Sequence, residues 1–211
     1  INKNSNRPES PKDIVLYGFG RIGRLVTRMM IQNTGPGNYY KLKAIVIRKA
    51  SDDDIYKRAS LLSRDSVHGS FDGTVRVDEE NLSLVINGNP VKIIYANSPK
   101  DVVYSDHGIK DPIVIDNTGV WRDESGLGLH IKSGASKTIL TAPAKGDIKI
   151  IVFGFTEEIL KIEDKIISSV YCPQNPIFLV LKFFNVEYEE EGDLFNTFNA
   201  NINIKNLLNT F

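Results

Sequence analysis

The feature that most constrains this chain is a glycine-rich turn at residues 18–23, with the sequence Gly-Phe-Gly-Arg-Ile-Gly. An apolar run at residues 14–17 precedes it, and apolar residues at helical spacing follow it, namely Ile22, Leu25, Val26, Met29 and Met30. Gly18 and Gly20 permit a tight turn and a close approach of the backbone, and Gly23 allows a helix to pack on the strand. Because the first amides of such a helix point at an anion, the pattern predicts a site for the pyrophosphate of a dinucleotide. The alternative is a structural turn that holds no ligand.

Composition narrows the class of protein further. The 211 residues are 41% hydrophobic and 25% charged, which argues against disorder and against membrane residence. Lys plus Arg and Asp plus Glu both number 26, so charge gives no support for a nucleic-acid partner. The apolar runs are far shorter than the ~20 residues of a membrane-spanning helix, and residues 1–11 lack the apolar core of a signal peptide. We therefore expect a cytoplasmic chain with no membrane partner.

Strand and helix patterns alternate after the glycine turn. Residues 33–38 read as a turn, and the apolar run at residues 42–47 predicts a buried parallel strand. Ser51 and Asp54 have the spacing of a capping box, which predicts a helix that begins there and ends near Leu62.

A β-meander is expected next, followed by a return to alternating strands and helices. Its strands are expected at residues 74–78, 82–86 and 91–95, the last two joined by an Asn87-Gly88 hairpin turn. Further strands are expected at residues 113–116, 138–141, 150–153 and 166–168, with a helix at residues 124–132. The sequence thus predicts an α/β fold, a Rossmann-type doubly wound and mostly parallel sheet with the meander as an insertion.

One cysteine, Cys172, follows the last predicted strand. Pro173 is a favourable first helical residue, so Cys172 is expected at a helix N-terminus, where the helix dipole favours the thiolate. The alternative is a small hydrophobic residue buried in the core. The acidic residues at 187–193 lack the spacing of a calcium-binding loop, and we expect a solvated loop and no metal site.

Together these segments resemble the phosphorylating glyceraldehyde-3-phosphate dehydrogenase family over about residues 13–182. The matching motifs are GFGRIGR (18–24), RDSVHG (64–69), NGNP (87–90), DNTGVW (116–121), GASKTILTAP (134–143) and the segment 166–175 around Cys172. The likeness is greatest to a longer bacterial branch with an N-terminal extension. It implies an oxidoreductase of glycolysis or gluconeogenesis, usually a homotetramer, that uses a phosphorylated aldehyde, inorganic phosphate and NAD or NADP.

The resemblance also assigns candidate residues. Gly18, Gly20, Arg21, Ile22 and Gly23 match the turn that binds the cofactor phosphates, and Asn117, Thr118, Gly119 and Thr141 match positions on the ribose and nicotinamide side. Cys172 matches the nucleophile that attacks the aldehyde before hydride passes to the nicotinamide. His68, His107 and His130 match no catalytic histidine, and we expect surface or capping roles for them.

Four departures from the family pattern bear on activity. Around the nucleophile the chain reads Tyr-Cys-Pro-Gln-Asn (171–175) where the family usually has Ser-Cys-Thr-Thr-Asn. Asn199 stands where the general-base histidine is expected, and an amide cannot take that proton. The sequence ends at Phe211, before the rest of the family's catalytic domain. Arg48 and Lys49 replace the acid that binds the adenosine ribose, which favours NADP over NAD. The alternative is that both cations are solvated and that Asp52 still reaches the ribose.

These features give a division of the chain and competing interpretations. We expect residues 1–12 to be a linker or extension remnant, 13–171 the NAD(P)-binding domain, and 172–211 the start of an α+β catalytic domain. The favoured function is an NAD(P)-dependent oxidoreductase of the glyceraldehyde-3-phosphate dehydrogenase type, with the 211 residues inactive by themselves. One alternative is a non-catalytic dinucleotide-binding or assembly subunit derived from that family. Another is that the last forty residues are an artefact on a normal enzyme.

Overall fold

The computed structural model describes residues 11–32, 40–151 and 159–169, all of which lie in one unit of the chain, Ile1–Val170. Its strands are β1 (Lys12–Tyr17), β2 (Tyr40–Ile47), β3 (Arg64–Asp65), β4 (Gly69–Ser70), β5 (Val75–Asp78), β6 (Ser83–Ile86), β7 (Asn89–Tyr95), β8 (Ile113–Asp116), β9 (Lys137–Leu140), β10 (Ile150–Ile151) and β11 (Ile166–Ser169). Its helices are α1 (Arg21–Gln32), α2 (Asp54–Ser63) and α3 (Glu124–Lys132), with short 3₁₀ turns η1 (Pro99–Asp101) and η2 (Tyr104–His107).

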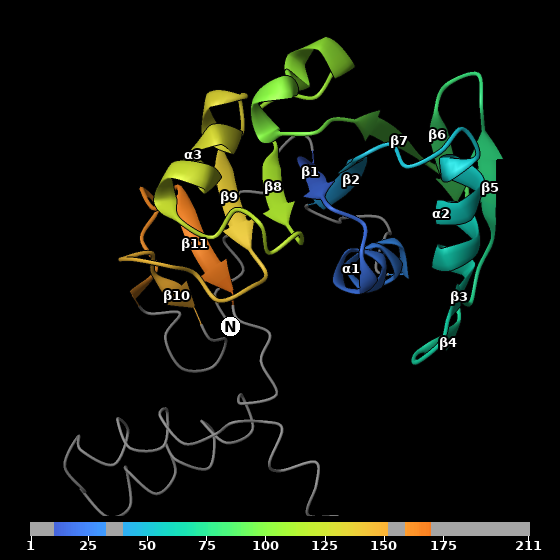
Figure 1. The fold of residues 1–211 in the computed structure, drawn as a ribbon, viewed down its shortest axis with the longest axis horizontal. Coiled ribbons are helices and arrows are strands. Elements are labelled where there is room, and N and C mark those ends of the chain that lie inside the picture. The colour runs from blue at the N-terminus through green and yellow to red at the C-terminus, as the bar shows by residue number, and fades with distance from the viewer. Residues whose placement is uncertain (1–10, 33–39, 152–158, 170–211) are drawn as a thin grey trace, which may run out of the picture. The chain divides into compact units, whose positions relative to one another are not determined.

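Nine of the described strands form one sheet in the order β10-β11-β9-β8-β1-β2-β7-β6-β5 (Figure 1). Pairing is parallel from β10 through to β7 and antiparallel between β7, β6 and β5. The predicted α/β fold with a doubly wound, mostly parallel sheet is therefore confirmed. Strands β3 and β4 pair separately.

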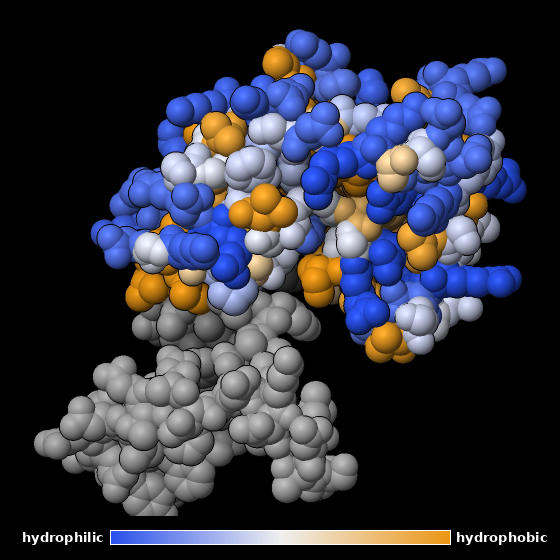
Figure 2. All heavy atoms as spheres, viewed as in Figure 1, coloured by the Kyte–Doolittle hydropathy of each residue, from blue (hydrophilic) through white to orange (hydrophobic). Residues whose placement is uncertain are grey.

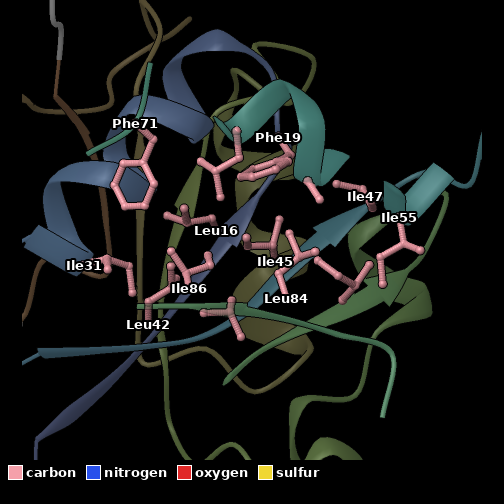
Figure 3. Close-up of a cluster of buried hydrophobic side chains, with 14 of the residues drawn as sticks. Leu16, Phe19, Ile31, Leu42, Ile45, Ile47, Ile55, Phe71, Leu84 and Ile86 are labelled. Carbon is pink, nitrogen blue, oxygen red and sulfur yellow. The ribbon is translucent and has the colours of Figure 1, made fainter. Parts of the chain in front are cut away.

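The two faces of the sheet can be followed in β1, whose side chains alternate between two cores. Ile14 and Leu16 pack with residues of α1 and α2, in the cluster shown in Figure 3. Val15 and Tyr17 pack on the opposite face, in a cluster that contains Val102 at the end of η1, Tyr104 of η2 and Ile131 of α3. Helical segments thus cover both faces. On the outside, hydrophilic residues dominate the face seen in Figure 2, with apolar residues in small scattered groups.

Strand β1 marks the point where the chain reverses its direction across the sheet. Its neighbours are β2 on one side and β8 on the other, and Tyr17 is level with both Val46 and Asp116. Ligands of open α/β sheets bind beyond the carboxyl ends of the strands at such a switch point. The glycine turn follows β1 at this position.

The predicted meander is present, and β7 connects it to the sheet. Strand β7 pairs in parallel with β2, and β6 and β5 then extend the edge in antiparallel fashion. The hairpin turn is confirmed, because Asn87 and Gly88 both have positive φ, 47° and 79°.

The predicted apolar face of α1 is partly wrong. The buried residues are Gly23, Thr27, Arg28 and Ile31, whereas Ile22 and Met29 are 39% and 57% exposed. The absence of a side chain at Gly23 brings the helix close to the turn, so the face that contains Gly23 and Thr27 packs inward. The apolar residues Val26 and Met30 flank that face.

The predicted start of α2 is also wrong in detail. Asp53 is the N-cap residue and its side chain makes no capping hydrogen bond. Ser51 contributes only its carbonyl oxygen, which accepts from the Asp54 amide at 3.4 Å. Asp54, the expected partner in a capping box, is fully buried and pairs with Arg58 instead. The predicted turn at residues 33–38, the second half of the predicted strand at 150–153, and every predicted feature beyond residue 169 lie outside the described residues.

Candidate dinucleotide site

A cleft of about 330 Å³ opens at the carboxyl ends of β1, β2, β7 and β8. The residues that line it are Tyr17, Gly18, Phe19, Gly20, Val46, Ile47, Arg48, Arg58, Ala96, Asn97, Asn117, Thr118, Val120 and Trp121. Five of the candidate residues therefore meet in one cleft, namely Gly18, Gly20, Arg48, Asn117 and Thr118.

The glycine turn fits the predicted close approach of a ligand. Gly18 has φ +94°, a conformation in which a side chain is strained, and an added Cβ would lie 2.7 Å from Thr118 Cγ2. An added Cβ at Gly23 would overlap the Gly18 carbonyl oxygen. At Gly20, by contrast, a Cβ would meet no atom within 4 Å, although Gly20 lines the cleft. Gly18 and Gly23 are thus required by the protein itself, and the space at Gly20 is open to a ligand.

The start of α1 is suited to an anion. Its first intrahelical bond runs from the Arg24 amide to the Gly20 carbonyl, so the amides of Arg21, Ile22 and Gly23 precede that ladder. The first turn has no acidic residue. Arg24 already pairs with Asp65 at 3.1 Å, whereas Arg21 is a cation at the positive end of the helix dipole, where a bound anion would offset the repulsion. Arg21 and Ile22 belong to this helix start and not to the lining of the cleft.

Asp116 and His130 support the opposite wall. Asp116 Oδ1 accepts from the amide and from Oγ1 of Thr118, both at 2.7 Å, and Oδ2 lies 3.1 Å from His130 Nε2. Both side chains of this pair are fully buried. A carboxylate only accepts hydrogen bonds, so Nε2 carries the proton. The pair fixes the loop that carries Asn117 and Thr118 into the cleft.

The sequence-based expectation for His130 is therefore wrong. We expected a surface or capping role, and the ring instead lies in the core, with its centroid 4.8 Å from that of Tyr17 in an edge-on arrangement. Burial, assisted by Asp116, raises the pKa of Tyr17 to about 12. The alternation of buried and half-buried residues along β8 could have suggested that Asp116 is buried. Its partner His130 lies fourteen residues away in α3, and no local pattern in the sequence signals that pairing.

Thr141, Gly119 and Lys49 lie outside the lining of the cleft. Thr141 Oγ1 lies behind the loop, 3.1 Å from the Asp116 carbonyl oxygen and 3.2 Å from Asn117 Oδ1, and its one proton is shared between these two acceptors. Gly119 has φ +64° in the same loop. Lys49 Nζ pairs with Asp52 at 3.0 Å on the surface, and the hydrogen bond that its ammonium donates to this carboxylate raises the pKa of Lys49. Cys172 lies outside the described residues.

Arg58 is a residue of the cleft that the sequence analysis missed. It comes from α2 and pairs with Asp54, one helical turn earlier. The spacing of an acid and a base four residues apart is a signal of pairing. It does not reveal that the acid is buried or that Arg58 lines the cleft.

Neither a metal centre nor a membrane span is found in the described part of the chain. Within residues 11–32, 40–151 and 159–169, no group of three or more His, Cys, Asp or Glu residues could hold a metal ion. None of the helices described in those ranges has the length and apolar character needed to cross a membrane.

Comparisons with known proteins show which family this chain resembles. The family described as "Glyceraldehyde 3-phosphate dehydrogenase, NAD binding domain" matches residues 12–124. A "Glyceraldehyde-3-phosphate dehydrogenase-like protein" of Pseudomonas aeruginosa (strain UCBPP-PA14) is 48% identical over 200 residues, which cover 94% of this chain and 43% of the relative. The "Glyceraldehyde-3-phosphate dehydrogenase" of Thermotoga maritima is 33% identical over 195 residues, which cover 92% and 56%. This chain thus spans about half the length of the curated relatives it matches.

Proposed function

The chain belongs to the glyceraldehyde-3-phosphate dehydrogenase family, and from this premise we propose that its cleft binds NADP at least as well as NAD for an aldehyde oxidoreductase of that type. The family match supports a nicotinamide dinucleotide as the cofactor and does not favour the alternative of a non-catalytic subunit. The substrate, the partners and the activity of the whole protein are part of the proposal.

The observation that carries the proposal is the open space at Gly20 between two constrained glycines. A pyrophosphate there would lie beside the amides of Arg21, Ile22 and Gly23 at the start of α1. Asn117 and Thr118, held by Asp116 and Thr141, would face the other half of the cofactor. The nicotinamide supplies the hydride acceptor when bound, and the role of the described residues is to hold and orient it.

Cofactor choice is inferred from the end of β2. Arg48 follows this strand and lines the cleft, where an NAD-selective protein would place an acid for the ribose hydroxyls. An arginine suits a 2′-phosphate, because its planar fork matches phosphate oxygens. Calorimetric titration of both cofactors tests this proposal. We expect binding of both, with NADP at least as tight, and loss of both in Gly20→Val. Failure of the wild-type chain to bind either cofactor would overturn it.

The catalytic role is carried over from the resemblance. We propose Cys172 as the nucleophile that attacks glyceraldehyde 3-phosphate, with inorganic phosphate as the second substrate, in a cytoplasmic homo-oligomer. We expect the 211 residues alone to lack phosphorylating activity, because Asn199 cannot act as a base and residues 171–175 depart from the family pattern. Losing a positioned base costs about 10²–10⁴ in rate. The assay is phosphate-dependent reduction of NAD and NADP with this aldehyde, with Cys172→Ser as the blank. Turnover above that blank would show that another group supplies the base.

A further inference from the structure

Two arginines from different elements line the cleft. Arg48 follows β2, and Arg58 lies in the second turn of α2. Both line the cleft, together with Ala96 and Asn97 that follow β7. The end of the second strand is where dinucleotide-binding folds recognise the adenosine ribose. A ligand in the cleft would therefore have two arginines among the residues around it.

Arg58 is held in place by a buried carboxylate. Its Nη2 lies 3.2 Å from Asp54 Oδ1, and its Nε donates to Oδ2 at 3.3 Å. The Asp54 side chain is fully buried, and that of Arg58 is 22% exposed. A guanidinium has five N–H donors, and this contact uses one of them in a hydrogen bond, so donors remain for a ligand. Because the fork is already oriented, little side-chain entropy remains to be lost when a phosphate binds.

Lys49 provides a contrast with Arg58. Its side chain is 54% exposed, it pairs with the fully exposed Asp52, and it lies outside the lining of the cleft. A compact ammonium ion paired with a neighbouring carboxylate offers a phosphate less than an oriented guanidinium does. Sequence position alone favours Lys49 as the partner of Arg48, whereas the geometry favours Arg58.

We propose that Arg58, oriented by Asp54, and Arg48 together bind the 2′-phosphate of NADP, so that Arg58 and not Lys49 is the second residue that selects this cofactor. This inference rests on the dinucleotide site proposed above. No carboxylate pairs with Arg48 within the described ranges, so its full charge is available to the phosphate. Asp54 cancels part of the charge of Arg58 and also sets its direction.

Calorimetric titration of NADP and NAD with two matched variants tests this assignment. Arg58→Met should weaken NADP binding at least about tenfold, the size of a lost charge-assisted hydrogen bond, and change NAD binding less than about threefold. Lys49→Met should leave both affinities within about threefold. The assignment would be overturned if Arg58→Met lost affinity for both cofactors equally, or if Lys49→Met lost affinity for NADP alone.

A second variant guards against a folding defect, since Arg58→Met leaves Asp54 buried without its partner. The double variant Asp54→Asn, Arg58→Gln removes both charges together and should show the same selective loss of NADP binding; unchanged NADP binding in this variant would refute the role of Arg58. If the wild type binds both cofactors and the variants do not discriminate, only this inference fails. If the wild type binds neither, the proposed function fails with it.

Discussion

Adding one methyl group at each of two glycines separates the structural role of the turn from its binding role. Gly23 and Gly20 lie three residues apart at the start of α1. An alanine Cβ at position 23 would overlap the Gly18 carbonyl oxygen, which is part of the backbone and cannot rotate away. At position 20 the same Cβ would meet nothing within 4 Å. The expected effects of Gly23→Ala and Gly20→Ala are therefore opposite in kind.

The magnitudes follow from this geometry. Overpacking typically lowers the free energy of unfolding by about 1–3 kcal/mol. Because the Gly18 carbonyl oxygen cannot move away, we expect Gly23→Ala to lie at the upper end of this range. Alanine regains about 1 kcal/mol of helix propensity inside α1, which leaves a destabilisation of about 2 kcal/mol. For a chain of this size that lowers the melting temperature by roughly 4–8 °C. Gly20 accepts the first helical hydrogen bond, and alanine at such a cap position costs at most about 1 kcal/mol.

Thermal unfolding and calorimetric titration of the two variants, measured side by side, test these expected effects on stability and on cofactor affinity. Gly23→Ala should melt well below Gly20→Ala. Gly20→Ala should melt close to wild type and lose at least about tenfold in affinity for NAD and NADP, because its methyl group occupies the space predicted for the pyrophosphate. The assignment of roles would be refuted if Gly23→Ala were as stable as Gly20→Ala, or if Gly20→Ala bound both cofactors like wild type.

Two further predictions concern contacts between α1, α2 and the segment after it. Arg28 is buried and donates twice to the Leu62 carbonyl, at 3.0 and 2.6 Å, and once to that of Gly69, at 3.0 Å. Arg28→Met should therefore cost about 2–4 kcal/mol in urea unfolding, whereas an effect below about 1 kcal/mol would contradict this role. The amides of His68 and Val67 hold the pKa of Asp65 well below its usual range. As the pH falls below about 4, Asp65 therefore takes up a proton in the unfolded state before it does so in the folded state. The free energy of unfolding should then fall more steeply with acid in the wild type than in Asp65→Asn. Parallel plots of this free energy against pH for the two proteins would exclude the linkage.

Local patterns were sufficient to predict much of the fold. The bounds of α3 and β8 agree with the expected ranges, because a polar cap and a short apolar run are visible in the sequence itself. The Asn87-Gly88 turn was equally clear, since its backbone conformation favours these two residues. The glycine turn predicted the position of the cleft because it follows the strand at which the sheet reverses.

The errors concern residues whose environment is set by distant segments. Arg28 is a charged residue on the inner face of α1, and it is buried because the carbonyl groups of Leu62 in α2 and Gly69 in β4 accept its hydrogen bonds. His130 is buried because Asp116 of a neighbouring strand pairs with it. Arg58 lines the cleft and pairs there with Asp54, whose side chain is fully buried. The pairings of Arg28 and His130 have no local spacing that predicts them, and the i,i+4 spacing of Asp54 and Arg58 predicts their pairing but not the burial of Asp54.

Amide hydrogen exchange with and without saturating NADP tests the central claim that the cleft beyond β1, β2 and β8 holds the dinucleotide. We predict additional protection at residues 19–23, whose amides lie at the start of α1, and at residues 117–119 of the opposite loop. Residues 110–111, near the amino ends of β1 and β2, serve as the internal control and should exchange unchanged. Protection centred on these control residues, or none at residues 19–23 while calorimetry shows NADP bound, would contradict the account.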